Sequence, residues 1–188
     1  MLDIEKKKEM FKDHVATLTD YGNIKILDFA KPGSLEYRIR FLFEEDYCRL
    51  HISGDFGELI ACNYNNMCYE KFSDFVHNPG YFSEKVYCHN RAFYEYDYDK
   101  AKEELKKRFD EIDLSPEYDW QTDEEYREDK ICEILEDFSQ ERGLGSKAYS
   151  ILNEIDHDCW SYAEDIGKEE TGILELYMLA FELAIKQL

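Results

Sequence analysis

The sequence predicts an α+β fold, with an antiparallel sheet of four to five strands packed by helices and a helical, acidic C-terminal half. Three observations lead to this prediction. Short runs of alternating apolar and polar residues recur between residues 24 and 64, and such alternation is typical of half-buried strands. Beyond residue 67 the apolar residues recur at helical spacing, which predicts helices on the sheet. From residue 97 onward acidic residues dominate.

The stretch from Tyr47 to Tyr64, Y-C-R-L-H-I-S-G-D-F-G-E-L-I-A-C-N-Y, predicts a β-hairpin at the centre of the sheet. Two alternating apolar runs flank a G-D-F-G turn. Gly54 and Gly57 bracket this turn, and glycine accepts the positive φ angles that tight hairpins need. The hairpin is therefore the centre of the predicted fold and the first place to look for a site.

The elements before the hairpin complete the predicted sheet. Residues 2–18 are expected to form an amphipathic helix, because their apolar residues follow helical spacing. Strands are predicted at 24–29 and 36–43, with a K-P-G-S turn between them. Together with the hairpin these strands form an antiparallel meander of about four strands.

The segment after the hairpin is expected to hold helices. Residues 67–76 suit a short helix lying on the sheet, and the sequence N-P-G favours the start of another over 78–86. Residues 92–98, A-F-Y-E-Y-D-Y, are either an extended piece or a fifth edge strand. A further helix then runs to about Phe109.

A polar connector at residues 110–122, which contains Pro116, is the predicted subdomain boundary. We therefore expect an α+β core over residues 1–109, with the hairpin at its centre. The remaining residues, 110–188, are expected to form an acidic helical subdomain packed on that core.

Helices fill the predicted subdomain. One is expected at residues 123–142, shorter ones at 146–166, and a strongly apolar one after Gly172. Because the last helix is apolar around most of its circumference, it must be buried. It packs either on the sheet or on a second copy of the chain, which would make a homodimer through this helix.

Charge is the strongest global signal, with 23 basic and 43 acidic residues and a net charge of −20. Residues 1–96 carry 12 basic and 16 acidic residues, whereas residues 97–188 carry 11 and 27. Such a surface repels phosphate backbones, so unaided binding of duplex DNA is not expected. Two interpretations remain: a solubilising acidic surface, or an acidic mimic that occupies the nucleic-acid channel of a basic partner.

The composition also bears on location and on cofactors. No run approaches the roughly 18 apolar residues of a membrane helix, and the N-terminus lacks the apolar core of a signal peptide. We therefore expect no membrane association and a cytoplasmic location. The six cysteines show no C-x-x-C pair and are interpreted as small core residues.

The acidic block from Asp110 to Asp137 is the candidate partner-binding site. Its carboxylates would mimic phosphates towards a basic protein, and its two aromatic residues would anchor the contact. The alternative is a solvated helix face with no partner. The predicted contact residues are Asp113, Glu117, Tyr118, Asp119, Trp120, Asp123, Glu124, Glu125, Glu128 and Asp129.

The hairpin offers a second candidate site, of a catalytic kind. If the segment 78–86 packs beside the hairpin, five polar side chains could converge. Asp55 and Glu58 could then hold Mg²⁺ for phosphodiester cleavage, with a lysine stabilising the developing charge and a histidine as general acid or base. The alternative is that the carboxylates only solvate a turn. The five residues are His51, Asp55, Glu58, Glu84 and Lys85.

Four segments together resemble a family of small phage and prophage proteins. They are S-G-D-F-G-E, the aromatic helix Y-E-K-F-S-D-F-V, the segment N-P-G-Y-F-S-E-K-V and the apolar C-terminal helix, in this order. The family typically reads G-D-M-G and N-P-x-Y-W-x-E-K, so Phe56 stands where Met is usual and Phe82 where Trp is usual. Both replacements keep an apolar packing residue. Size and acidity are also similar to those of type II anti-CRISPR proteins, the inhibitors of Cas9.

These resemblances imply a phage-derived anti-defence protein in the cytoplasm of the host cell. It would inhibit a CRISPR effector, with Cas9 as the leading candidate, or the effector's guide-RNA complex, by acidic contact with the nucleic-acid-binding surface. One alternative is a metal-dependent ribonuclease that cleaves guide RNA, and only this alternative calls for Mg²⁺. Another is a non-enzymatic phage accessory or assembly module.

Overall fold

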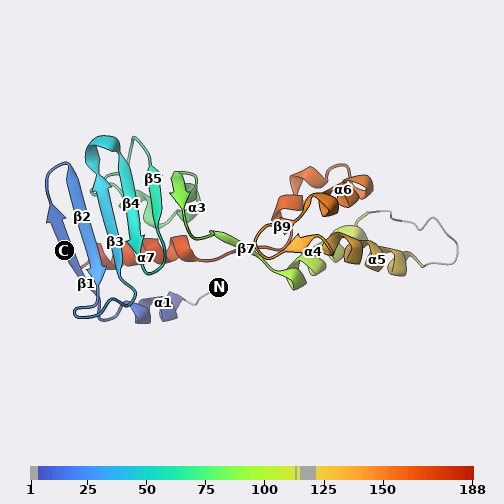
Figure 1. Ribbon diagram of the computed structural model, residues 1–188, viewed down its shortest axis with the longest axis horizontal. Coiled ribbons are helices and arrows are strands. Elements are labelled where there is room, and N and C mark those ends of the chain that lie inside the picture. The colour runs from blue at the N-terminus through green and yellow to red at the C-terminus, as the bar shows by residue number, and fades with distance from the viewer. Residues whose placement is uncertain (1–3, 113, 115–121) are drawn as a thin grey trace. The chain divides into compact units, whose positions relative to one another are not determined.

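The computed structural model describes residues 4–112, 114 and 122–188, and it confirms the α+β class (Figure 1). The chain divides into two compact units. We call residues 1–93 with 172–188 the sheet unit, and residues 94–171 the helical unit. Each unit has its own core of buried apolar side chains.

The predicted boundary at residue 110 is therefore wrong in two respects. The helical unit begins at Tyr94, and the C-terminal helix belongs to the sheet unit rather than to the acidic subdomain. The physical reason is that the apolar surface of that helix packs on the sheet. The helical unit is thus an insertion between two parts of the sheet unit.

The sheet unit is built on one six-stranded sheet, where four to five strands were predicted. The strands follow one another in space in the order of the sequence, and every neighbouring pair is antiparallel. The predicted meander is thus correct and is extended at both edges. The strands are β1 (Val15–Asp20), β2 (Ile24–Ala30), β3 (Ile39–Glu44), β4 (Arg49–Gly54), β5 (Leu59–Cys62) and β6 (Val86–His89).

The predicted helix at 2–18 is wrong in its second half. Helix α1 (Ile4–Met10) ends early, and Val15 begins β1. Residues 15–20 read V-A-T-L-T-D, so β-branched side chains alternate with two apolar residues, and this pattern suits a strand as well as a helix. All six residues pair with β2, and this pairing favours the strand over the helix.

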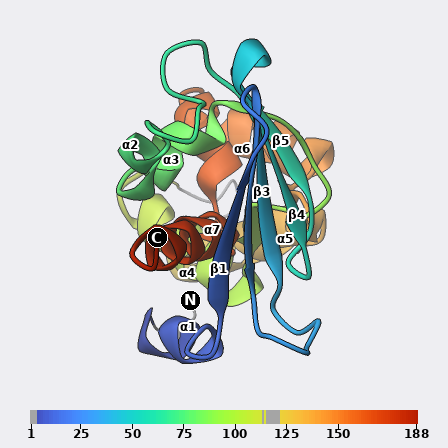
Figure 2. The ribbon, with the colours of Figure 1, turned by 90° about the vertical axis from the view of Figure 1, so that its left-hand side faces the viewer.

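Helices cover one face of the sheet. Figure 2 shows α2 (Ser73–Val76), α3 (Pro79–Ser83) and α7 (Ile173–Ile185) on the same side. The ring of Phe181 on α7 lies 4.7 Å from that of Phe72 and 5.4 Å from that of Phe41. The C-terminal helix therefore packs on the sheet, and no second copy is needed to bury it.

Two predicted segments around β6 also differ from the structure. The helix predicted at 78–86 ends at Ser83, and β6 follows it as the last strand of the sheet. The strand predicted at 92–98 exists as β7 (Tyr94–Tyr96), but it pairs with β10 (Lys168–Glu170) within the helical unit. A short 3₁₀ turn, η1 (Glu45–Tyr47), links β3 to β4.

One end of the sheet edge at β1 is capped by Gln187. The side-chain amide of Gln187 accepts a hydrogen bond from Ala16 N (3.0 Å) and donates one to the carbonyl oxygen of His14 (3.1 Å). Gln187 thus occupies backbone groups that a further strand would otherwise use. Open strand edges invite pairing with other chains, so this contact protects the sheet.

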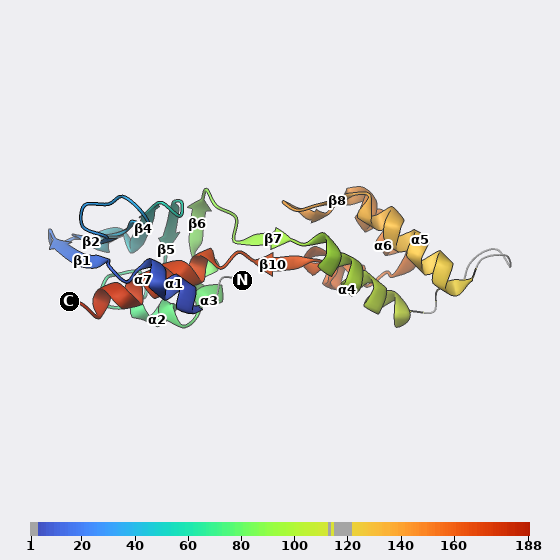
Figure 3. The ribbon, with the colours of Figure 1, turned by 90° about the horizontal axis from the view of Figure 1, so that it is seen from below.

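The helical unit packs three longer helices around a core that includes Leu105, Phe109, Ile134 and Leu152 (Figure 3). The helix predicted at 123–142 ends at Leu135, because a short hairpin follows. The short helical segments expected at 146–166 are confirmed. The elements are α4 (Tyr98–Asp110), α5 (Asp123–Leu135), β8 (Phe138–Ser139), β9 (Gly143–Leu144), α6 (Ser146–Ile155), η2 (Cys159–Ser161) and η3 (Ala163–Asp165), besides β7 and β10.

His14 is a buried titratable group in the sheet unit. Its ring lies 5.1 Å from the rings of Phe11 and Phe29, and Nε2 lies 3.1 Å from the carbonyl oxygen of Tyr37. Nδ1 is buried without a hydrogen-bond partner. Burial lowers the pKa of His14 below its usual value, against the opposing effect of the bond to Tyr37.

We predict that acid destabilises the sheet unit through His14. A folded-state pKa below the unfolded value of about 6.5 means that the unfolded chain binds the proton first, so stability falls as the pH drops below that value. The loss is at most about 1.4 kcal/mol per pH unit. Urea unfolding at pH 7.5 and pH 5.5 measures it. His14→Gln should reduce the difference, and His77→Gln, at an exposed histidine, should not. Equal pH dependence in both variants would contradict the prediction.

The separate cores predict separate responses to core substitutions. Phe181→Ala should lower the free energy of unfolding of the sheet unit by about 3–5 kcal/mol, and Leu105→Ala that of the helical unit by about 2–5 kcal/mol. Native-state hydrogen exchange, read at the amides of β3 and of α4, measures both losses. If either variant weakened protection equally in the two units, the division into units would be wrong.

Candidate functional site

Helix α5 carries the described part of the predicted acidic site, and it begins with a capping box. The Thr122 hydroxyl oxygen accepts a hydrogen bond from Glu125 N (3.3 Å), and a Glu125 carboxylate oxygen accepts one from Thr122 N (3.0 Å). The hydrogen bonds that the Thr122 N–H and hydroxyl donate to the Glu125 carboxylate lower the pKa of Glu125. Asp123 and Glu124 are exposed in the same first turn, where the helix dipole favours negative charge.

Further along α5, charged residues pair with residues of α4. Glu128 lies 3.8 Å from Lys106, and Arg127 lies 3.6 Å from Asp110. Asp129 is exposed. Five of the ten predicted contact residues are thus placed on one helix. The other five, Asp113, Glu117, Tyr118, Asp119 and Trp120, lie outside the described residues.

The helical unit as a whole has a large surplus of negative charge. Its sequence holds 26 acidic and 10 basic residues, a net charge of −16, whereas the sheet unit holds 17 and 13. Seven of the ten cations already lie within 4.0 Å of a carboxylate of the same unit. Few cations of this unit are therefore left to balance its remaining carboxylates.

The structure does not bring the five hairpin candidates together. Gly54 and Gly57 have the expected positive φ angles. Asp55 and Glu58 are both exposed in this turn, just before β5 begins. Lys85 lies at the opposite end of β5, because its carbonyl oxygen accepts a hydrogen bond from Cys62 N (2.9 Å). Four residues of strand separate the two ends, about 13 Å.

The remaining hairpin candidates have other partners. The Lys85 ammonium lies 3.2 Å from Glu84 and 4.2 Å from the centre of the Tyr81 ring. His51 Nε2 lies 2.8 Å from a carboxylate oxygen of Glu44 on β3. The predicted convergence on Asp55 and Glu58 is therefore wrong, because β6 runs antiparallel to β5 and begins beside Ala61 rather than beside the turn.

Among the described residues, one group of side chains has ligand atoms close enough to be considered for a metal ion. It consists of Glu45, Cys68 and Glu70, whose ligand atoms lie within 4.8 Å of one another. The ammonium of Lys25 pairs with Glu70 and lies 3.9 Å from Glu45. Its hydrogen bond to Glu70 raises the pKa of Lys25. Lysine thus already supplies the positive charge at this cluster, and we assign no metal site there.

The six cysteines are free thiols. The prediction that they are core residues is correct for Cys159 alone, which is buried, and burial raises its pKa. Cys88 and Cys132 are exposed, and the other three are half-buried. The prediction failed because four of the cysteines occur on or beside the sheet, and two of them, Cys62 and Cys88, lie on its solvent-facing side.

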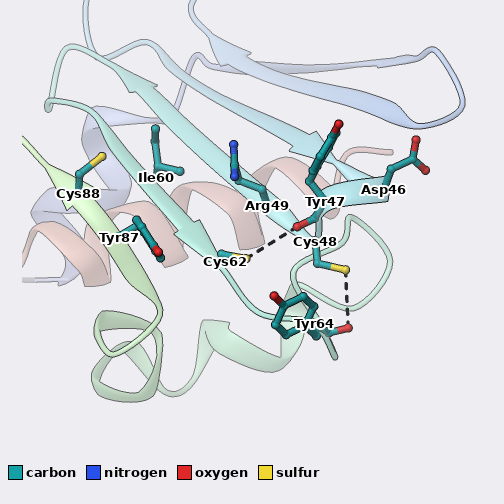
Figure 4. Close-up of a pocket in the computed structure, with 9 residues that line it drawn as sticks. All are labelled: Asp46, Tyr47, Cys48, Arg49, Ile60, Cys62, Tyr64, Tyr87 and Cys88. Carbon is teal, nitrogen blue, oxygen red and sulfur yellow. Dashed lines mark hydrogen bonds between the residues drawn. The ribbon is translucent and has the colours of Figure 1, made fainter.

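A groove on the sheet unit was missed by the sequence interpretation (Figure 4). It measures about 470 Å³ and is lined by residues that include Tyr47, Arg49, Cys62, Tyr64 and Tyr87. These come from three segments, so no local motif signals them. The one signal in the sequence is the position of the tyrosines, each of which lies within two residues of a strand end.

Comparison with family models, curated proteins and solved structures finds no match to this chain. Among the described residues, no helix is both long enough and apolar enough to cross a bilayer. The site has therefore to be interpreted from its own chemistry.

We predict that the capping box holds the acidic end of α5 in place. Thr122→Ala removes the acceptor for Glu125 N and should lower the free energy of unfolding of the helical unit by about 1 kcal/mol. Thr122→Ser keeps the hydroxyl and should leave most of that stability. Hydrogen exchange of the first-turn amides of α5 measures the difference. Equal protection in the two variants would show that the cap contributes nothing.

Proposed function

We propose that this chain inhibits a basic nucleic-acid-binding protein by contact with the acidic surface of its helical unit. The partner we propose is a CRISPR effector in the cytoplasm of a bacterial host, with Cas9 as the first candidate. The observation that carries the proposal is the net charge of −16 on the helical unit, most of whose cations are already paired within it.

The physical basis is competition with a polyanion. A groove that binds RNA or DNA presents clustered lysine and arginine side chains, and its affinity for phosphates depends on the release of counterions. The exposed carboxylates of Asp123 and Glu124 can meet such cations. The like charges of the helical unit also steer the approach to a basic surface, with a rate that falls as salt screens the attraction.

The resemblance to small phage proteins supports the choice of partner, since a phage gains from inactivating a host nuclease. The ribonuclease alternative loses its geometric support, because the carboxylates of the hairpin and Lys85 do not converge. A phage accessory or assembly module without a role against host defence is the other outcome that the experiment must distinguish.

We predict that purified protein inhibits DNA cleavage by a Cas9–guide RNA complex and binds it in a salt-dependent manner. Asp123→Asn/Glu124→Gln should weaken binding by about tenfold, because it removes two charges that face the partner. Asp55→Asn/Glu58→Gln is the matched control: it removes two exposed acids from the sheet unit and should leave binding unchanged. Titration calorimetry between about 50 and 200 mM salt measures both variants.

Four results would contradict the proposal. Binding that is insensitive to salt, or equally weakened by both variants, would remove the acidic contact as its basis. Cleavage of the guide RNA that depends on Asp55 and Glu58 would restore the ribonuclease alternative. If no CRISPR system is inhibited in a plaque assay, an accessory or assembly role is the better interpretation.

A further inference from the structure

The groove of the sheet unit opens on the face of the sheet that α7 does not cover. Arg49, Ile60 and Cys62 line it, and they alternate along β4 and β5 with core residues such as Leu50 and Ala61. Successive side chains of a strand point to opposite faces, so the groove and the core lie on opposite sides of the sheet.

Two backbone irregularities direct additional side chains into the groove. Cys48 has a φ of 48°, a left-handed conformation that residues other than glycine rarely adopt. As a result Tyr47, Cys48 and Arg49 all line the groove although they are consecutive. Strain of this kind is concentrated at functional sites.

The second irregularity lies on β6. The pairing register shifts between Ile60 and Ala61, so that Tyr87 is an extra residue opposite β5. Tyr87 and Cys88 consequently both line the groove, whereas neighbours in a regular strand would face opposite sides. Bulges commonly redirect a side chain next to a binding site.

Thiol groups hold the two tyrosine-bearing turns together, as the dashed lines in Figure 4 show. Cys62 Sγ donates to the carbonyl oxygen of Tyr47 (3.8 Å), and the thiol of Cys48 lies within reach of the carbonyl oxygens of Tyr64 (3.7 Å) and Glu45 (3.8 Å). Asn63 N adds a hydrogen bond to the carbonyl oxygen of Cys48 (3.1 Å). These contacts link the segment of Tyr47 to that of Tyr64, while the tyrosine side chains themselves are exposed.

The tyrosine rings are unusually open to solvent. The exposed fraction is 67% for Tyr47, 87% for Tyr64 and 85% for Tyr87. Tyrosine and arginine side chains are enriched in binding hot spots. A tyrosine offers a flat apolar face and a hydroxyl group while losing little conformational entropy on binding.

The charges in the groove argue against an anionic ligand. Among the residues that line it, Arg49 is the one cation, and its guanidinium lies 3.7 Å from Glu44 and 5.8 Å from the centre of the Tyr47 ring. Asp46 lines the same groove and offsets that charge. With a net charge of −20 on the chain, phosphates are repelled. The ligand should be neutral or basic.

We infer that this groove binds a proline-rich peptide segment of a partner protein, carrying a basic residue. Such segments adopt the polyproline II helix and dock in grooves lined by aromatic side chains. From β4 to β6 the groove crosses two strand spacings, about 10 Å, and one turn of that helix measures about 9 Å. Proline rings would lie on the tyrosine faces, the tyrosine hydroxyls would donate to peptide carbonyls, and Asp46 would pair with the basic residue.

The test uses the full-length protein and a mixture of synthetic dodecapeptides, each with two Pro-x-x-Pro repeats and one terminal arginine, titrated to about 1 mM, the weak end of specific binding. NMR shifts of the backbone amides report binding. We expect saturation at the groove residues and about tenfold weaker binding for Tyr64→Ala and for Tyr87→Ala. Tyr21→Ala is the matched control, because Tyr21 is 69% exposed on the same unit and does not line the groove.

Any of the following results overturns the inference: no saturable shift with the mixture, equal affinity for peptides whose prolines are replaced by glycine, or equal weakening in the Tyr21→Ala control. A hexauridylate probe tests single-stranded nucleic acid as the ligand. If it binds in preference to the peptides and the binding is lost in Tyr64→Ala and Tyr87→Ala, the groove is a nucleotide site. Melting temperatures of the three variants show that each remains folded.

Discussion

The packing of α7 on the sheet is the interaction on which the sheet unit depends. Alternation along the strands makes one entire face of the sheet apolar, and that face needs a cover. Helices α2 and α3 have four and five residues and cannot supply it alone. Helix α7 has 13 residues, a length of about 20 Å, which spans about four strands. Phe181 then lies within 6.4 Å of four aromatic rings from the sheet and from the segment before α2.

Much of this fold could be predicted from local patterns, and the failures have a common cause. The α+β class, β2 to β5 and the burial of the last helix follow from periodicity, because each pattern is complete within one segment. Strand β1 was missed because the pattern of Val15–Asp20 suits a helix as well as a strand. Only the pairing with β2 decides between the two. The boundary at Tyr94 was missed, since it depends on an association between distant segments that no local pattern records.

The same distinction between local patterns and long-range associations explains why the acidic helical unit was predicted and the tyrosine groove was not. Net charge depends on the sequence alone, so the acidic character of the helical unit could be predicted even though its boundaries were predicted wrongly. The T-x-x-E sequence at Thr122 is likewise a local capping signal. By contrast, the convergence proposed for Asp55 and Lys85 needed the direction of β6, which the sequence does not reveal. The tyrosine groove needed a register shift and a left-handed residue, and neither has a sequence signature.

The contact of Gln187 with the β1 edge has a consequence for synthesis on the ribosome. β1 and β2 are translated first, whereas residues 172–188, which contact the outer edge of β1 and help to cover the apolar face of the sheet, are translated last. The 78 residues of the helical unit are translated in between. At about 5–20 residues per second, the nascent sheet stays uncovered for roughly 4–16 s. During that interval its apolar face and open edge are available to chaperones and to other nascent chains.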